Sequence, residues 1–242
     1  MKNTRLILVL LGMILLVLSP AWQTQEKKDI QAVLVKVVRD VEKKGSEAKA
    51  WTKALSNDQL KAGYEIKTLK GSAALISFLD NSKIVVRENS LVQIKGQVQG
   101  KQIIDRDVYM ERGKLQFEVK KQEAEQFRFT SPISVASIRG TGGEIDSYGG
   151  DSAWALCTHG SFDFANSHSH DHVIIDAGHI GFTYGNGSLT WRPANQNELG
   201  GANTNLGGGQ DTSHTGGNTK DLIIYGEDQN GQPKRIVIKI QQ

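Results

Sequence analysis

The sequence contains very little cysteine and proline. Only one of its 242 residues is cysteine (Cys157), and only four are proline. A single cysteine excludes a disulfide framework within the chain. The composition also excludes a collagen-like or compositionally disordered chain. The length is sufficient for one or two compact domains with a sizeable core.

A strong excess of one charge is absent as well. The formal net charge is +3, and two of the basic residues, Lys2 and Arg5, lie in a segment that we expect to be removed. Without them, 27 basic residues stand against 26 acidic ones, a net charge of +1. This balance gives no reason to expect nucleic acid or an anionic membrane as the main partner.

The apolar run nearest the N-terminus is short. It extends over 13 residues from Leu6 to Leu18, whereas a helix that spans a bilayer needs about 20. Lys2 and Arg5 precede the run, and small residues follow it up to Ala21. This order is typical of a secretory signal peptide over residues 1–21, cut after Ala21. We therefore predict a periplasmic or secreted bacterial protein with no stable membrane span after cleavage. The alternative is an inner-membrane anchor formed by an uncleaved signal.

Short apolar runs with a period of two dominate the rest of the chain. Leu115, Phe117 and Val119 alternate with polar residues, and Phe127 and Phe129 repeat the pattern. Such runs recur about every 8–12 residues between turn-forming residues, which is typical of an all-β sandwich, barrel or solenoid. Helical patterns long enough for crossover connections do not separate them, so a parallel α/β fold is not expected.

The C-terminal part has two expected segments. Residues 195–218 are rich in Gly and Asn and predict a flexible linker or a long surface loop. Residues 219–242 predict a β-hairpin with Asn230-Gly231 at its turn. Because an isolated hairpin is marginally stable in water, we expect it to dock on the main body, for example by adding to an open strand edge.

Histidines are concentrated in one region, between His159 and His179. Within it, His168, His170 and His172 alternate and would share one side of an extended segment. Imidazole suits divalent transition metals, and three histidines with an open fourth position form a chemically reasonable site. The alternative is an exposed polar loop in which these histidines bind metal only adventitiously.

Other reactive residues do not form an enzyme signature. Glu144 and Asp146 are two apart and could share a face, but such pairs are common on solvated strands. Cys157 lies near His159, yet a small buried cysteine in an apolar strand is favoured over a thiolate nucleophile. We therefore predict no catalytic residues and no cofactor, apart from the metal that the histidines could hold.

Several short blocks follow one another in order between Leu60 and Thr183. They are Leu60, Gly63 and Thr68; Gly71–Phe78 with Asp80-Asn81-Ser82; Glu88-Asn89-Ser90; Gly113–Val119; Phe127–Pro132; Ser137–Thr141; and Ala177-Gly178. The ordered set resembles the FecR-domain family, which occurs in bacterial envelope sensor proteins. The resemblance implies a β-solenoid-like domain of short stacked strands over residues 22–194, with its core match over 60–183. A two-sheet β-sandwich is the structural alternative.

The resemblance also implies a role. We predict an exported, non-enzymatic FecR-domain protein that serves as a protein-interaction, sensory or envelope scaffold module, with another envelope protein as its partner. Family members that regulate sigma factors carry a cytoplasmic helical domain before this region. Only five residues precede the apolar run here, so direct inhibition of a sigma factor is not expected. The alternatives are a metal- or saccharide-binding protein that uses the region His159 to His179, and an envelope polysaccharide hydrolase.

Overall fold

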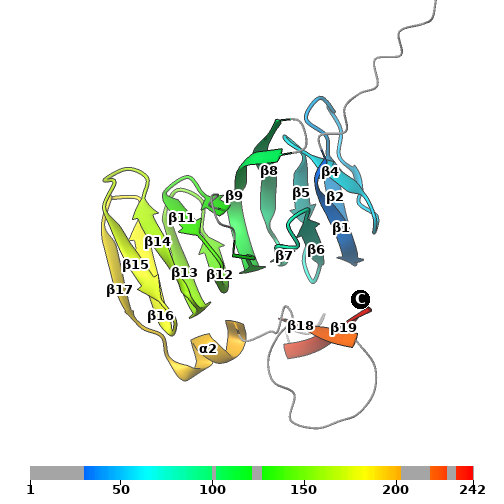
Figure 1. Cartoon of the computed structure of the whole chain (residues 1–242). Coiled ribbons are helices and arrows are strands. Elements are labelled where there is room, and N and C mark those ends of the chain that lie inside the picture. Colours follow the sequence, from blue (N-terminus) through cyan, green and yellow to red (C-terminus); the bar gives the residue numbers. More distant parts are fainter. Residues whose placement is uncertain (1–29, 100–101, 122–126, 203–218, 228–232, 242) are drawn as a thin grey trace, which may run out of the picture.

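The computed structural model describes residues 30–99, 102–121, 127–202, 219–227 and 233–241. The predicted signal peptide and its cleavage site at Ala21 lie outside the described residues. Within these ranges, seventeen strands form one large open sheet that folds into two packed faces, and two further strands form a separate hairpin. Figure 1 shows the strands in a row from β1 at one end to β17 at the other.

Each face of the sheet contains strands from the whole length of the row. Face A consists of β1 (Ile30–Val38), β4 (Gln59–Lys61), β6 (Ala73–Phe78), β7 (Lys83–Val86), the C-terminal part of β9 (Gln102–Glu118), β12 (Gly142–Ser147), β13 (Ser152–His159), β16 (His179–Tyr184) and β17 (Leu189–Pro193). Face B consists of β2 (Val41–Lys44), β3 (Thr52–Lys53), β5 (Glu65–Thr68), β8 (Leu91–Gln99), the N-terminal part of β9, β10 (Phe127–Thr130), β11 (Ser134–Ile138), β14 (Ser161–Asn166) and β15 (His172–Asp176).

Successive hairpins alternate between the two faces. The pairs β6–β7, β12–β13 and β16–β17 belong to face A, whereas β10–β11 and β14–β15 belong to face B. The long strand β9 takes part in both faces, so the chain forms one continuous sheet rather than the two separate sheets of the sandwich alternative. The predicted all-β fold of short stacked strands is confirmed.

The core lies between the faces and follows the period-two pattern of the sequence. Leu115 and Phe117 of β9 and Val119 directly after it are buried there, as predicted, together with Phe127 and Phe129 of β10. The ring of Phe117 on face A lies 5.0 Å from that of Phe129 on face B, measured between centroids. Alternation on each strand therefore directs one set of side chains into a shared aromatic core.

A second, smaller apolar cluster lies on the outer side of face A. It contains Leu156 and Ile180, and Leu199 of the helix α2 (Gln196–Ala202) packs against it. Asn195 and Glu198 begin this helix with a capping box: the Asn195 side chain accepts a hydrogen bond from the Glu198 amide at 2.9 Å, and the Glu198 carboxylate accepts one from the Asn195 amide at 2.8 Å. The segment 195–218 was expected to be a linker or loop, but its first residues form this short helix because its caps and its apolar contact are both present.

The predicted C-terminal hairpin is present as β18 (Thr219–Glu227) and β19 (Pro233–Gln241). The two strands pair antiparallel and form a sheet of their own. The expected turn at Asn230-Gly231 lies outside the described residues, and docking of the hairpin on the main body stays a prediction. Among the described residues, no helix has both the length and the apolarity that a membrane span requires.

Candidate functional site: a charged groove beside the bend of β9

The site begins where β9 passes from one face to the other. Residues up to Arg112 pair with β8, and residues from Gly113 onward pair with β12. Gly113 has φ 104°, and a Cβ placed on it would lie 2.5 Å from Cα of Ser90. Only glycine permits this conformation and this close approach. The bend therefore depends on one residue.

The turn between β7 and β8 is fastened to this bend. The Ser90 hydroxyl accepts a hydrogen bond from the Lys114 amide at 3.0 Å. The Thr68 hydroxyl accepts one from the Ser90 amide at 3.1 Å and donates one to the carbonyl of Arg87. These buried hydroxyls hold Arg87 at the edge of β9 and so fix one wall of the site.

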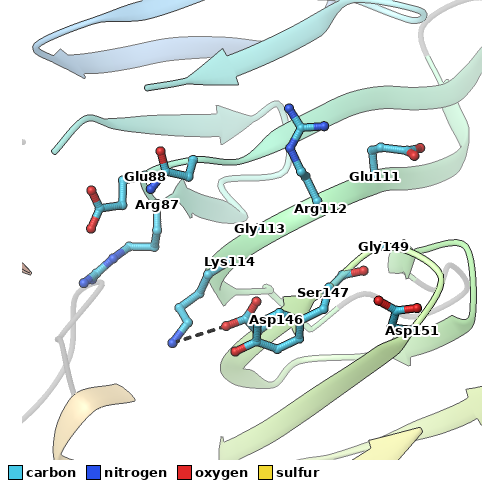
Figure 2. Close-up of a pocket in the computed structure, with 12 residues that line it drawn as sticks. Arg87, Glu88, Glu111, Arg112, Gly113, Lys114, Asp146, Ser147, Gly149 and Asp151 are labelled. Atoms are coloured by element: carbon cyan, nitrogen blue, oxygen red, sulfur yellow. Dashed lines mark ion pairs between the residues drawn. The ribbon is translucent and has the colours of Figure 1, made fainter. Parts of the chain in front are cut away.

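Three segments enclose a groove with a volume of about 680 Å³. They are the β7–β8 turn, the bend of β9 and the β12–β13 turn, and their lining residues are Arg87, Glu88, Asn89, Glu111, Arg112, Gly113, Lys114, Asp146, Ser147, Tyr148, Gly149 and Asp151. Figure 2 shows the Lys114 side chain of the β9 bend directed toward Asp146 at the end of β12. The volume lies in the range of ligand-sized clefts.

A charged cluster continues from the groove along the outer side of face A. The Lys114 ammonium lies 3.2 Å from the Glu144 carboxylate and 3.5 Å from that of Asp146. Gln116 donates a hydrogen bond to Glu144 at 3.0 Å and accepts one from Arg87 at 3.3 Å. Two acidic and two basic side chains thus form one connected set, which we call the Lys114 cluster.

Both carboxylates of this cluster are nearly inaccessible, with 6% of Glu144 and 7% of Asp146 exposed. The pKa of Asp146 is raised, and burial is the main cause. The charge of Lys114 opposes this rise, and the negative charge of the neighbouring Glu144 adds to it. Burial also lowers the pKa of Arg87, and Glu144 and Glu88 oppose that effect. The prediction that Glu144 and Asp146 share a face is correct. The interpretation of that face as solvated is wrong, because both side chains are buried beside a groove.

The geometry of the cluster suits recognition better than catalysis. Glu144 and Asp146 are neighbours on one strand, and both are directed toward the Lys114 ammonium. Glycosidic acid–base pairs instead face each other across the space that holds the substrate. Fixed charges of both signs at the edge of a cleft provide donors and acceptors for a polar ligand.

The predicted metal-binding histidines lie elsewhere: His168 and His170 are in the exposed loop between β14 and β15, and His172 is the first residue of β15. Nδ1 of His168 faces the carbonyl of Gly185, and Nδ1 of His170 faces the carbonyl of His168. His172 instead approaches the Asp163 carboxylate, 3.1 Å away. The structure does not bring the three imidazoles into one ligand set, and among the described residues no group of three or more His, Cys, Asp or Glu is placed to hold a metal ion. Metal binding here stays a prediction.

Cys157 is buried in the core, and its thiol contacts the carbonyls of His159 and Gly160 at 3.4 Å. Burial, assisted by the charge of Asp176, raises the pKa of the thiol to about 12. A thiol in this state is a poor nucleophile at neutral pH. The structure agrees with the interpretation of Cys157 as a small core residue.

Residues 64–161 match the family model described as FecR protein. This segment is a FecR domain. It lies within the stretch 60–183 that resembles the family in sequence, and it contains all twelve residues that line the groove. The predicted family assignment is confirmed for this part of the chain.

Two solved structures have a similar fold. Both are of a candidate anti-sigma factor from Parabacteroides distasonis ATCC 8503, at 1.65 Å and 2.50 Å resolution. Each is 13% identical in sequence and aligns with 58% of this chain, with TM-scores of 0.49 and 0.50. The aligned parts span 65% and 64% of those chains. At this identity the likeness concerns the fold alone. No curated protein matches the sequence.

Proposed function

We propose that the chain is an exported, non-enzymatic periplasmic FecR-domain protein, and that its groove binds an extended segment of another envelope protein. The observation that carries the proposal is the preformed charged groove at the β9 bend, inside the FecR domain. FecR domains are typically periplasmic and regulatory rather than enzymatic, which supports both parts of the proposal. The sequence pattern of residues 1–21 supports export.

The lining of the groove favours a polypeptide as the ligand. It carries three basic side chains (Arg87, Arg112 and Lys114) and four acidic ones (Glu88, Glu111, Asp146 and Asp151). A nearly balanced set suits a ligand with charges of both signs and does not suit the uniformly negative backbone of a nucleic acid. Tyr148 lies at the rim with 58% of its surface exposed. Exposed tyrosines beside a cleft are frequent anchors in protein interfaces.

Cross-linking in the native envelope, followed by mass spectrometry of the captured proteins, tests the proposal. The variants are Tyr148→Ala and Arg112→Glu, and the matched control is Tyr184→Ala, which removes a 41% exposed tyrosine outside the groove. We expect the unaltered protein to capture one dominant protein, each groove variant to lower that capture about tenfold, and the control to retain it. Equal capture by groove and control variants would refute the use of the groove.

Export is tested separately. Fractionation of cells that carry the intact chain is expected to place the protein in the periplasm, with an N-terminus at Trp22. Removal of residues 1–21 is expected to keep the protein in the cytoplasm and to abolish the captured partner. Capture of the same partner by protein that stays in the cytoplasm would contradict the periplasmic part of the proposal.

A further inference from the structure

Two aliphatic side chains of face A are buried on the side that faces away from the core. Leu75 of β6 and Val85 of β7 are cross-strand partners, and their chain neighbours, such as Ile76 and Ile84, belong to the core. Successive side chains of a strand point to opposite sides. Leu75 and Val85 therefore point outward, yet only 2% and 0% of their surfaces are exposed. Other protein atoms therefore lie above this side of face A, and packing against a further element is the usual way to bury an apolar sheet face.

The helix α2 covers a different part of the same surface. The cross-strand row that starts at Leu75 and Val85 continues through Gln116 and Glu144 to Leu156. Leu199 of α2 packs at the Leu156 end of this row, in a cluster that does not include Leu75 or Val85. The strands β1 to β17 are already used in the two faces. Among the described strands and helices, β18 and β19 belong neither to these two faces nor to the cluster beneath α2.

The hairpin has the pattern that such a cover requires. In its ladder, Leu222 is opposite Ile238 and Ile224 is opposite Ile236, and Ile240 is two residues beyond Ile238. These five positions share one face of the hairpin by the period of two. A two-stranded sheet with one apolar face is marginally stable in water unless that face is packed. The connection from Ala202 to Thr219 has 16 intervening residues, which can extend up to about 50 Å.

We infer that the outer side of face A around Leu75 and Val85 is the docking surface of the β18–β19 hairpin, which packs there through the face that contains Leu222 and Ile238. The hairpin forms a third layer beside α2 and does not extend an edge of the large sheet, which agrees with its separate two-stranded ladder. This cover also accounts for the burial of Gln116 and Glu144, which lie next in the same row. The inference is independent of the partner proposed above.

Thiol accessibility in the chain from Trp22 to Gln242 tests this inference. Val85→Cys introduces a thiol on the proposed docking surface, and Leu55→Cys introduces one at a site with 59% of its surface exposed. The native Cys157 is a buried internal reference, and mass spectrometry of the peptides distinguishes the labelled positions. We expect the thiol at position 85 to react at least 100-fold more slowly than the one at position 55.

The decisive comparison disrupts one face of the hairpin at a time. Ile238→Asp alters the proposed docking face, and Lys239→Asp alters the opposite face of the same strand. We expect Ile238→Asp to accelerate labelling at position 85 at least tenfold and Lys239→Asp to leave the rate unchanged. Where Val85→Cys does not fold, as judged by its circular dichroism, Leu75→Cys replaces it with the same expected result.

Four results would overturn the inference. They are rapid labelling at position 85 with the hairpin unaltered, equal effects of Ile238→Asp and Lys239→Asp, protection that rises with protein concentration, and protection that occurs only when residues 1–21 are retained. The third result would assign the cover to a second copy of the chain, and the fourth would assign it to the N-terminal segment.

Discussion

The Ser90 hydroxyl accepts a hydrogen bond from the Lys114 amide at 3.0 Å, and this contact joins the β7–β8 turn to the bend of β9. The same approach leaves no room for a side chain on Gly113, whose Cβ position would lie 2.2 Å from Oγ of Ser90. The two walls of the groove are therefore held together by backbone and hydroxyl contacts. The charged side chains project from a frame that is rigid without them.

Gly113→Ala is expected to destabilise the protein by about 3 kcal/mol or more. The added methyl group meets the backbone of Ser90 as well as its side chain, and φ 104° is unfavourable for alanine. The free energy of unfolding from urea titration measures this effect. Gly149→Ala is the matched control, because it has φ 67° with no atom within 4 Å of the new Cβ. The control should lose only about 1–2 kcal/mol, and an equal loss in both variants would show that backbone strain alone explains the effect.

Lys114→Met is expected to destabilise the protein more at pH 7 than at pH 3.5. Burial already raises the pKa of Asp146, and removal of the Lys114 charge raises it further. A carboxyl whose pKa is higher in the folded state than in the unfolded state lowers stability as the pH rises from the unfolded pKa through the folded one. The loss at pH 7 should reach about 3 kcal/mol, because a buried carboxylate loses its cation.

Urea unfolding at the two pH values measures this difference. Lys44→Met is the control, since Lys44 forms an ion pair at 2.9 Å with Glu65, a carboxylate more exposed than Glu144 or Asp146. The control should lose less than about 1 kcal/mol at pH 7. A loss for Lys114→Met that is the same at pH 3.5 and pH 7 would mean that side-chain packing, and not charge, explains its role.

The core could be predicted from the sequence because its pattern is local. The alternation of Leu115, Phe117 and Val119 is visible in one heptapeptide, and the structure buries all three. The path of β9 could not be predicted in the same way. Gly113 is the first residue of one of the blocks that resemble the family, yet it lies inside a 17-residue strand whose two parts belong to different faces.

The candidate site was missed for a related reason. The pattern of Glu144 and Asp146 reveals which residues share a face, but it carries no information on what lies above that face. Their burial depends on residues distant in the sequence, such as Lys114. The helix α2, in contrast, had a local signal. The spacing of Asn195 and Glu198 is that of a capping box, and it was obscured by the glycines that follow.

Cys157 is expected not to react with a thiol reagent at pH 8 while the protein is folded. Its pKa of about 12 leaves almost no thiolate, and its side chain lies in the core. Labelling should become rapid above the midpoint of urea unfolding, because the unfolded thiol regains an ordinary pKa. Leu55→Cys gives the rate of an exposed thiol in the folded protein. Rapid labelling of Cys157 without denaturant would reveal local opening of the strands around it.

Asn195→Ala is expected to weaken the attachment of α2 by about 1 kcal/mol, because the substitution removes the side-chain half of the capping box. Hydrogen exchange of the helix amides should become about fivefold faster, whereas Gln196→Ala, at an exposed position of the same turn, should leave it unchanged.

The pairing with Arg192 and the Asn195 amide lowers the pKa of Glu198 to about 2. A depressed carboxyl pKa stabilises the folded state above the unfolded value of 4.5, and this stabilisation is lost as the pH falls toward 2. The protection factors of the helix amides in the unaltered protein should therefore be lower at pH 2.5 than at pH 7, and Glu198→Gln should remove most of this pH dependence. A helix that exchanges equally in Asn195→Ala and in the unaltered protein would mean that Leu199 packing alone holds α2 on face A.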